Sequence, residues 1–262
     1  MTIAESIILG LIQGLTEFIP ISSSGHLVIA QYFFSGASDH LFLEWINIGT
    51  MLALVVYFWR KIVTICGDVF IRRHYKLARN ILITAVPAGA VGYLAADFID
   101  KTAFFGSIIV VVVMSALVGI VMITLEKLPK ASSVRNGEAL SGKRALAIGL
   151  AQMIALIPGT SRSGATIIAG RLSGLNAKEA AEYSFLASLP IMVGVTLKVF
   201  LHDHEYLFAH FDTLFVANLA AFISGLLAVG FLMRYLTKHS LALFGWYRVI
   251  MAAFVIVVIL LQ

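Results

Sequence analysis

The sequence predicts an all-α polytopic membrane protein, with six transmembrane helices and two re-entrant helical hairpins in an inverted-topology repeat. First, the 262-residue chain is 60% hydrophobic and 13% charged, far more apolar than soluble globular proteins. Second, apolar segments long enough to cross a hydrocarbon core of about 30 Å recur along its whole length. Third, two of these segments are interrupted by related polar motifs.

Six apolar segments run without a break and predict the transmembrane helices. They are residues 42–59, 81–98, 106–125, 184–201, 214–233 and 246–261. Two further segments are interrupted, and residues 3–18 resume at 26–34 while residues 145–157 resume at 165–172. Each second arm has about nine residues, or roughly 13 Å of helix, which is too short to cross the membrane. We therefore expect two re-entrant hairpins whose irregular backbone is buried in protein.

The two interrupted segments are copies of one element, because a single shift along the chain superimposes them. The matched pairs are Gly10 and Gly149, Gln13 and Gln152, Ser22 and Ser161, Ser24 and Ser163, and Gly25 and Gly164. A hairpin followed by three spans ends on the side opposite to its start, so the two copies have opposite orientations. We expect one membrane domain, residues 1–262, built from inverted repeats of about 1–130 and 140–262, with the hairpin tips meeting near the midplane.

The basic residues fall on one side of this predicted topology. Residues 60–79, 126–144, 171–183 and 234–245 carry 15 lysines and arginines, whereas 1–41, 99–105 and 202–213 carry only Lys101. This is a positive-inside pattern, and it places the ends of the first hairpin outside and those of the second inside. Because membrane insertion explains the net charge of +5, we expect no nucleic-acid partner. The first residues lack a basic region, so we expect no cleavable signal peptide.

The second break holds a buried cation among hydroxyl groups. Arg162 lies between Ser161 and Ser163, with Thr166 one turn later. An arginine inside an apolar segment costs about 2.5–3.5 kcal/mol on insertion scales, which is tolerable where an anion meets it. The start of a half-helix also favours an anion through its free N–H groups and dipole, and a guanidinium matches phosphate oxygens.

The first break supplies an acid, hydroxyls and an imidazole. Gln13 and Glu17 are four residues apart and share one helix face. They are followed by the tip residues Ser22, Ser23, Ser24 and His26. Each has a structural alternative, since the glutamate and glutamine could anchor helix packing, the serines could cap helices and the histidine could be packed. Together with a facing arginine they favour an anion site.

This set of side chains is suited to phosphoryl transfer. His26 or Ser23 could attack phosphorus, or water could do so directly. Arg162 and the helix ends would stabilise charge on the phosphate oxygens. Glu17 could shuttle a proton, or hold a divalent cation together with Gln13 and the phosphates of the substrate.

The two motifs together resemble the signatures of a known family, the undecaprenyl-diphosphate phosphatases of the bacitracin-resistance type. Residues 13–26 resemble the first signature, and residues 158–166 resemble the second, PGxSRSxxT. The resemblance runs along essentially the whole chain. It implies a hydrolase of the bacterial inner membrane that removes the terminal phosphate of undecaprenyl diphosphate and so recycles the carrier lipid for cell-wall precursors. It also implies a Mg²⁺ or Ca²⁺ cofactor and a site reached from the outer, periplasmic side.

The residues and the resemblance together predict the roles of ten side chains. We expect Glu17, Ser23, His26 and Arg162 to be catalytic, Gln13, Ser22, Ser24, Ser161, Ser163 and Thr166 to bind substrate, and Glu17 and Gln13 to bind the metal. Gln13 stands where the family often has glutamate, which leaves a single carboxylate and weakens a two-carboxylate metal site.

Two other functions compete with the phosphatase. A transporter or flippase for a lipid phosphate or a small anion also fits inverted repeats with broken helices. An intramembrane serine protease would pair a serine with His26, but it leaves Arg162 without a role. The expected partners are undecaprenyl diphosphate and membrane lipid, with a homodimer left open.

Overall fold

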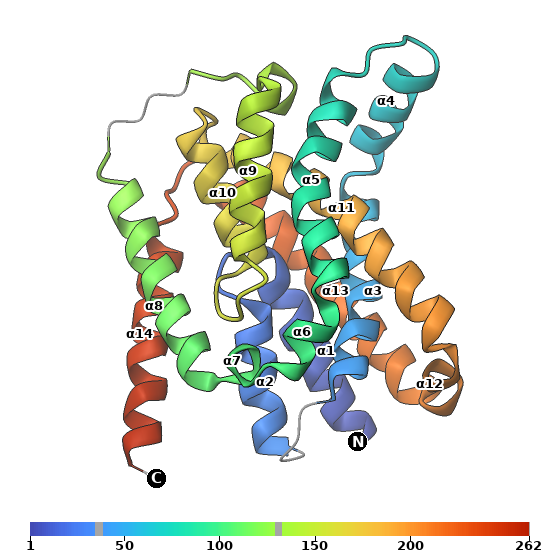
Figure 1. The fold of residues 1–262 in the computed structure, drawn as a ribbon, viewed down its shortest axis with the longest axis vertical. Helices are drawn as coiled ribbons and strands as arrows, with labels where there is room; N and C mark the ends of the chain where they lie inside the picture. The colour runs from blue at the N-terminus through green and yellow to red at the C-terminus, as the bar shows by residue number, and fades with distance from the viewer. Residues whose placement is uncertain (35–38, 129–132, 262) are drawn as a thin grey trace.

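Helices account for the regular structure of residues 1–34, 39–128 and 133–261, which are the parts of the chain that this computed structural model describes, and no strand forms among them (Figure 1). In chain order the helices are α1 (Ile3–Phe18), α2 (Ser23–Phe34), α3 (His40–Tyr57), α4 (Trp59–Phe70), α5 (Lys76–Leu94), α6 (Ala96–Lys101), α7 (Ala103–Gly106), α8 (Ile108–Leu125), a 3-10 turn η1 (Gly137–Ala139), α9 (Gly142–Ile154), α10 (Arg162–Leu172), α11 (Ala177–His202), α12 (His204–Ala209), α13 (Phe211–Tyr235) and α14 (Ala242–Leu260).

The described residues contain five helices that are long and apolar enough to span a membrane, namely α5, α8, α11, α13 and α14. A sixth span is counted if α3 and α4 are taken as one helix bent by 73°. The prediction of an all-α, multi-pass membrane protein is therefore confirmed. The bend and α4 were not predicted, because residues 59–61 (Trp-Arg-Lys) end the apolar run and α4 buries none of its residues.

The two predicted hairpins are the helix pairs α1–α2 and α9–α10, which reach toward each other from opposite ends of the molecule (Figure 1). Their connecting loops lie at mid-height in that view. This arrangement is compatible with re-entrant hairpins related by an inverted repeat. The expected restarts at residues 26 and 165 are wrong, because α2 begins at Ser23 and α10 at Arg162. The hydroxyl of Ser161 caps α10 by accepting a hydrogen bond from the Gly164 N–H at 3.1 Å, so the polar motif is itself the first turn.

The halves of the chain interlock through close helix contacts. Helix α1 packs on α13, and α9 packs on α5, so the first arm of each hairpin lies on a span of the other half. A Cβ added at Gly10 would lie 2.2 Å from the Ala217 carbonyl oxygen, and one at Gly149 would lie 2.7 Å from the Thr84 carbonyl oxygen. Glycine is required at both places because the neighbouring backbone occupies the space of a side chain.

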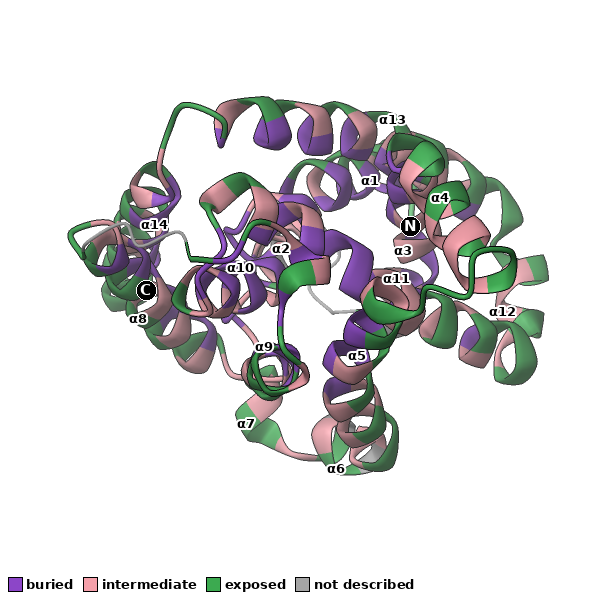
Figure 2. Ribbon diagram, turned by 90° about the horizontal axis from the view of Figure 1, so that it is seen from above, coloured by how far each residue is buried: buried purple, intermediate pink, exposed green. Residues whose placement is uncertain are grey.

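Buried residues gather on the central helices, and exposed apolar residues face outward. Seen from above, α1, α2 and α10 carry much of the buried surface, whereas α6, α7 and α12 lie at the periphery (Figure 2). The outward residues are large and apolar, for example Leu227, Phe254 and Leu260, which are 67–79% exposed. Such a surface suits a lipid solvent.

Candidate active site

The tips of the two hairpins are joined by an ion pair. Arg162, the first residue of α10, donates from Nη2 to Oε1 of Glu17 at 2.6 Å. Glu17 belongs to the last turn of α1, and the two side chains are 12% and 22% exposed for the acid and the base. The Ser163 hydroxyl also donates to the Glu17 backbone carbonyl at 3.4 Å. The structure therefore brings the predicted acid and the predicted arginine into direct contact.

The other carboxylate oxygen of Glu17 is held within its own half of the chain. Ser23 Oγ donates to Glu17 Oε2 at 2.5 Å, and Gln13 Nε2 approaches the same oxygen at 3.3 Å. Gln13 Nε2 also donates to Asn47 Oδ1 of α3 at 2.7 Å. Glu17 is thus the hub of a cluster that joins α1, α2, α3 and α10. Asn47 was not predicted, because no local pattern marks an amide on a neighbouring span.

The serines that precede each second arm share one unusual backbone geometry. Ser22 has a φ of 75° and Ser161 a φ of 72°, although neither is glycine. Their hydroxyls lie 3.3 Å from Ser24 Oγ and 3.2 Å from Ser163 Oγ, respectively. Such conformations cost on the order of 1–3 kcal/mol and gather at functional sites. The repeat seen in the sequence is therefore also a repeat of loop geometry.

His26 turns toward α14 rather than toward the ion pair. Its Nδ1 lies 2.8 Å from the Ser22 carbonyl oxygen, which can only accept, so Nδ1 carries the proton. Its Nε2 then accepts from the Tyr247 hydroxyl at 2.7 Å. The structure does not bring His26 into a hydrogen bond with Glu17 or Arg162.

The remaining predicted residues differ in access. Thr166 is 1% exposed, and its hydroxyl donates to the Arg162 carbonyl at 2.8 Å and lies 2.5 Å from the Ser184 hydroxyl of α11. Ser22 is also buried, whereas Ser24 is exposed. Thr166 thus sits behind the arginine, and Ser24 lies where a solute can reach it.

The donor set fits a divalent cation only in part. The described residues contain no group of three or more histidine, cysteine, aspartate or glutamate side chains that could hold a metal. Glu17 is the one carboxylate of the cluster, with the amide of Gln13 and the hydroxyl of Ser23 beside it. Mg²⁺ is commonly held by one or two carboxylates together with substrate phosphates. The residues therefore fit a cation that is shared with a bound diphosphate.

Two neighbouring residues of α14 complete the surroundings of the first loop and were not predicted. Tyr247 contacts His26, and Arg248 donates to the Pro20 carbonyl oxygen at 3.2 Å. The available signal was a lone arginine inside an apolar span, which is rare and expensive in a membrane.

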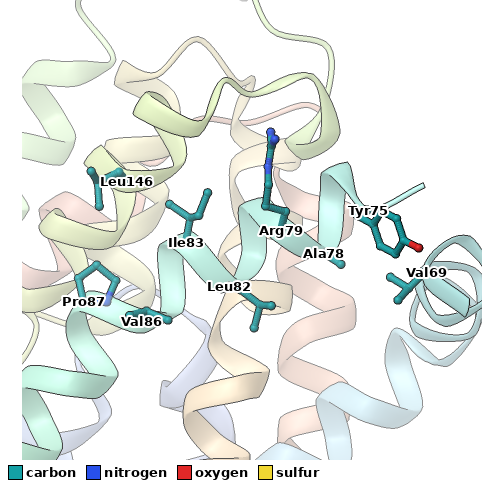
Figure 3. A pocket seen from close by; sticks show the side chains of 9 residues that line it. All are labelled: Val69, Tyr75, Ala78, Arg79, Leu82, Ile83, Val86, Pro87 and Leu146. Atoms are coloured by element: carbon teal, nitrogen blue, oxygen red, sulfur yellow. The ribbon is translucent and has the colours of Figure 1, made fainter. Parts of the chain in front are cut away.

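A separate groove lies away from the hairpin tips, between the end of α4, α5 and α9. It has a volume of about 530 Å³ (Figure 3). Its lining residues are Val69, Tyr75, Ala78, Arg79, Leu82, Ile83, Val86, Pro87 and Leu146. None of the ten predicted site residues lines it.

The chain is similar to proteins of one named group. The family model described as bacitracin resistance protein BacA matches residues 6–254. Undecaprenyl-diphosphatase 1 of Clostridioides difficile (strain 630) is 36% identical over 264 residues, covering 98% of this chain and 96% of that protein. Undecaprenyl-diphosphatase of Rubrobacter xylanophilus is 38% identical over 276 residues, covering 100% of both chains. Undecaprenyl-diphosphatase of Korarchaeum cryptofilum is 38% identical over 263 residues, covering 95% of this chain and 97% of that protein.

Proposed function

The chain belongs to the bacitracin resistance protein family, and on this premise we propose that it hydrolyses undecaprenyl diphosphate to undecaprenyl phosphate and phosphate. It is then a polyprenyl-diphosphate phosphatase that works within a membrane. The observation that carries the proposal is the junction of the two motifs, where Arg162 of one hairpin and Ser23 of the other both bind Glu17.

The diphosphate binds between the two half-helix starts. Helices α2 and α10 both begin at the junction, so their free N–H groups and positive dipole ends face the same region. Arg162 uses one Nη atom for Glu17, and its other N–H groups are directed to phosphate oxygens. These donors stabilise the charge that spreads over the phosphoryl oxygens in the transition state.

Ser23 is the nucleophile that the hydrogen bonds favour. Its hydroxyl lies 2.5 Å from Glu17 Oε2, so the carboxylate accepts the proton as Oγ bonds to the terminal phosphorus. The bond from phosphorus to the bridging oxygen breaks, and undecaprenyl phosphate leaves with that oxygen. Water then attacks the phosphoserine and gives a proton to Glu17 as Glu17 returns its proton to Ser23 Oγ, so that phosphate is released and both residues are restored. Both ring nitrogens of His26 are already engaged, which argues against histidine as the nucleophile.

A divalent cation, Mg²⁺ or Ca²⁺, would be held by Glu17 and Gln13 together with the phosphates of the substrate. When bound, it would neutralise part of the diphosphate charge and so favour departure of the lipid phosphate. The single carboxylate of this cluster supports a cation that arrives with the substrate.

We place the enzyme in the bacterial inner membrane, with its site reached from the periplasmic side. The distribution of lysine and arginine supports this orientation, because the segments rich in them all fall on the predicted cytoplasmic side. The first hairpin then opens outward, with Ser24 accessible at its tip.

Phosphate release by purified protein in detergent micelles tests the activity. With undecaprenyl diphosphate and Mg²⁺ or Ca²⁺, the wild type is expected to release phosphate, and Glu17→Ala and Arg162→Ala to lower kcat/KM by at least about 10²-fold each. Glu182→Ala is the matched control, because it breaks another inter-helix ion pair, with Lys61 at 2.9 Å, without touching the junction. A folded wild-type protein that releases no phosphate would overturn the proposal.

A trapping experiment tests the nucleophile separately. A reaction with substrate labelled in the terminal phosphate is quenched during turnover, and the expected product is phosphoserine at position 23. Label on His26 would show that histidine, and not Ser23, is the nucleophile. Turnover without labelled protein would favour direct attack by water.

A flippase for a lipid phosphate is the second candidate, because two broken helix pairs that reach in from opposite ends resemble the sites of alternating-access transporters. Detergent micelles separate the two functions, since hydrolysis needs no second compartment. Folded protein that binds the lipid diphosphate without hydrolysing it would favour transport.

A further inference from the structure

Arg248 is a fully buried cation near the start of the last predicted span. It is 0% exposed, and it lies in α14. Its guanidinium donates from Nε to the Ser115 carbonyl oxygen at 3.1 Å, from Nη1 to the Pro20 carbonyl oxygen at 3.2 Å and from Nη2 to the Gly159 carbonyl oxygen at 2.5 Å. Among the described residues, no carboxylate forms an ion pair with it.

Two of these three carbonyls are equivalent positions of the repeat. The shift that superimposes Ser22 on Ser161 also superimposes Pro20 on Gly159. One guanidinium therefore holds the same carbonyl of both loops, just before the serines with positive φ. A planar fork with several fixed N–H directions can bind two acceptors on different segments at once, which a lysine ammonium does less specifically.

Close packing of α8 and α14 brings Arg248 to this place. A Cβ at Gly245 would lie 2.7 Å from the Gly119 carbonyl oxygen, and one at Gly119 would lie 2.8 Å from the Gly245 carbonyl oxygen. The two helices touch through these glycines, and Arg248 follows Gly245 by three residues on α14. The guanidinium can thus pass the Ser115 carbonyl of α8 and reach the loops.

Arg248 also places a positive charge near the junction, and no carboxylate of the described residues pairs with it. Neutral carbonyls accept one hydrogen bond from each of its three nitrogens, but they bring no net negative charge, and a buried charge without a counter-charge is costly. The other arginine of the junction, Arg162, is already paired with Glu17. An anionic diphosphate would therefore meet one positive charge that no side chain of the described residues balances.

We propose that Arg248 is a positioning residue for the phosphatase, a role that rests on the function proposed above. It sets the spacing between the two hairpin loops, and through them the contact of Ser23 and Glu17 with Arg162. Its unbalanced charge also favours binding of the diphosphate. The arginine itself touches neither the substrate nor the reacting atoms.

Two substitutions of Arg248 separate spacing from charge. Arg248→Lys keeps the charge and loses the fork, so kcat is expected to fall by about 10²-fold with little change in KM, because small displacements of reacting groups are costly. Arg248→Met loses both, so kcat falls similarly and KM rises as well. Activity is measured below the melting temperature of each variant and normalised to folded protein. Arg234→Met, at an exposed position late in α13, is the control for loss of an arginine and should match the wild type.

A third substitution displaces Arg248 indirectly and provides the test if the first two variants fail to fold. Gly245→Ala places a methyl group 2.7 Å from the Gly119 carbonyl oxygen, which forces α14 away from α8 and displaces the guanidinium. It should lower kcat, whereas Gly194→Ala, where nothing lies within 4 Å, should not. Wild-type kcat in folded Arg248→Lys or in Gly245→Ala overturns the positioning role, and an unchanged KM in Arg248→Met overturns the role of the charge. Absence of activity in the wild type would instead refute the proposed function.

Discussion

The two hairpins share one frame but carry different chemistry. Both loops place a serine at positive φ and a second hydroxyl two residues later, at Ser22 and Ser24 in the first and at Ser161 and Ser163 in the second. The positions proposed to be catalytic differ, as Glu17 corresponds to a leucine, Ser23 to an arginine and His26 to an alanine. Those counterparts are Leu156, Arg162 and Ala165. The repeat thus supplies two loops with the same backbone geometry, each of which can bind an anion. The differences between the two copies supply Glu17 in one loop and Arg162 in the other, and these form an ion pair across the junction.

The glutamines of the first arms show the same contrast. Gln13 reaches the carboxylate of Glu17 and the amide of Asn47. Its counterpart Gln152 donates only to the Thr84 carbonyl oxygen at 3.4 Å, and its own buried Oε1 has no partner among the described residues. One copy belongs to the hydrogen-bonded cluster around Glu17, while the other copy bridges α9 and α5. A duplicated residue therefore does not imply a duplicated role.

The largest effect is expected where the copies differ most in chemistry, at Ser23. Ser23→Ala removes the hydroxyl that Glu17 activates, and kcat should fall by at least about 10³-fold. Single-turnover phosphate release measures it. Ser24→Ala is the control, since within the described part of the chain that hydroxyl has a hydrogen bond with Ser22 alone, and the change should cost a few-fold at most. Equal losses in the two variants would show that the hydroxyl frame, and not Ser23, carries the reaction.

A smaller effect is expected at His26, the position that is alanine in the second copy. His26→Ala removes the contacts with the Ser22 carbonyl and with Tyr247, and we expect kcat to fall by about 10- to 100-fold as the loop loosens. Tyr247→Phe removes one hydrogen bond, worth about 0.5–1.5 kcal/mol, and should cost about tenfold or less. Steady-state kinetics of the two variants check this order, and a larger loss in Tyr247→Phe would contradict it.

Gln13→Glu sharpens the difference between the glutamines by adding a second carboxylate beside Glu17. The extra charge should tighten the divalent cation, so that half-maximal activity needs several-fold less Mg²⁺ or Ca²⁺ after removal of metal with EDTA. Metal titrations of phosphate release measure this. Gln152→Glu, the same change in the other copy, should not alter the metal dependence, and an equal shift in both variants would remove Gln13 from the metal site.

The smallest effect is expected for Gln152→Ala. Its single long hydrogen bond to the Thr84 carbonyl predicts a loss of about 1 kcal/mol in stability with unchanged kcat. Thermal unfolding in detergent and phosphate release are the two measurements. A fall in kcat at unchanged stability would show that the second glutamine also serves the site.

The sequence was sufficient for the features that local pattern controls. Apolar length predicted the spans, and the repeated serine motifs predicted two breaks whose tips meet, which the contact of Glu17 with Arg162 agrees with. The helix starts were misplaced because the hydroxyls of the motif cap the helix and belong to its first turn. The roles of the individual site residues stay predictions.

What the sequence could not supply depends on distant contacts. Asn47, Tyr247 and Arg248 reach the site from spans that are far away in the chain, and nothing near them in sequence indicates which loop they touch. The bend between α3 and α4 falls at residue 58, which is phenylalanine, so no proline or glycine marks it in the sequence. Of these residues, only Arg248 could be noticed in the sequence, because an arginine inside an apolar span is rare.

The interlock of α1 with α13 bears on how the protein is made. Gly10 of α1 packs against the backbone at Ala217 of α13, which is synthesised more than two hundred residues later. Until α13 is made, α1 lacks its final packing partner. The nascent chain must therefore stay in the bilayer or at the insertion machinery with the Glu17 carboxyl group not yet packed in its final position. The proposed site therefore cannot take its final form until α13 has been made.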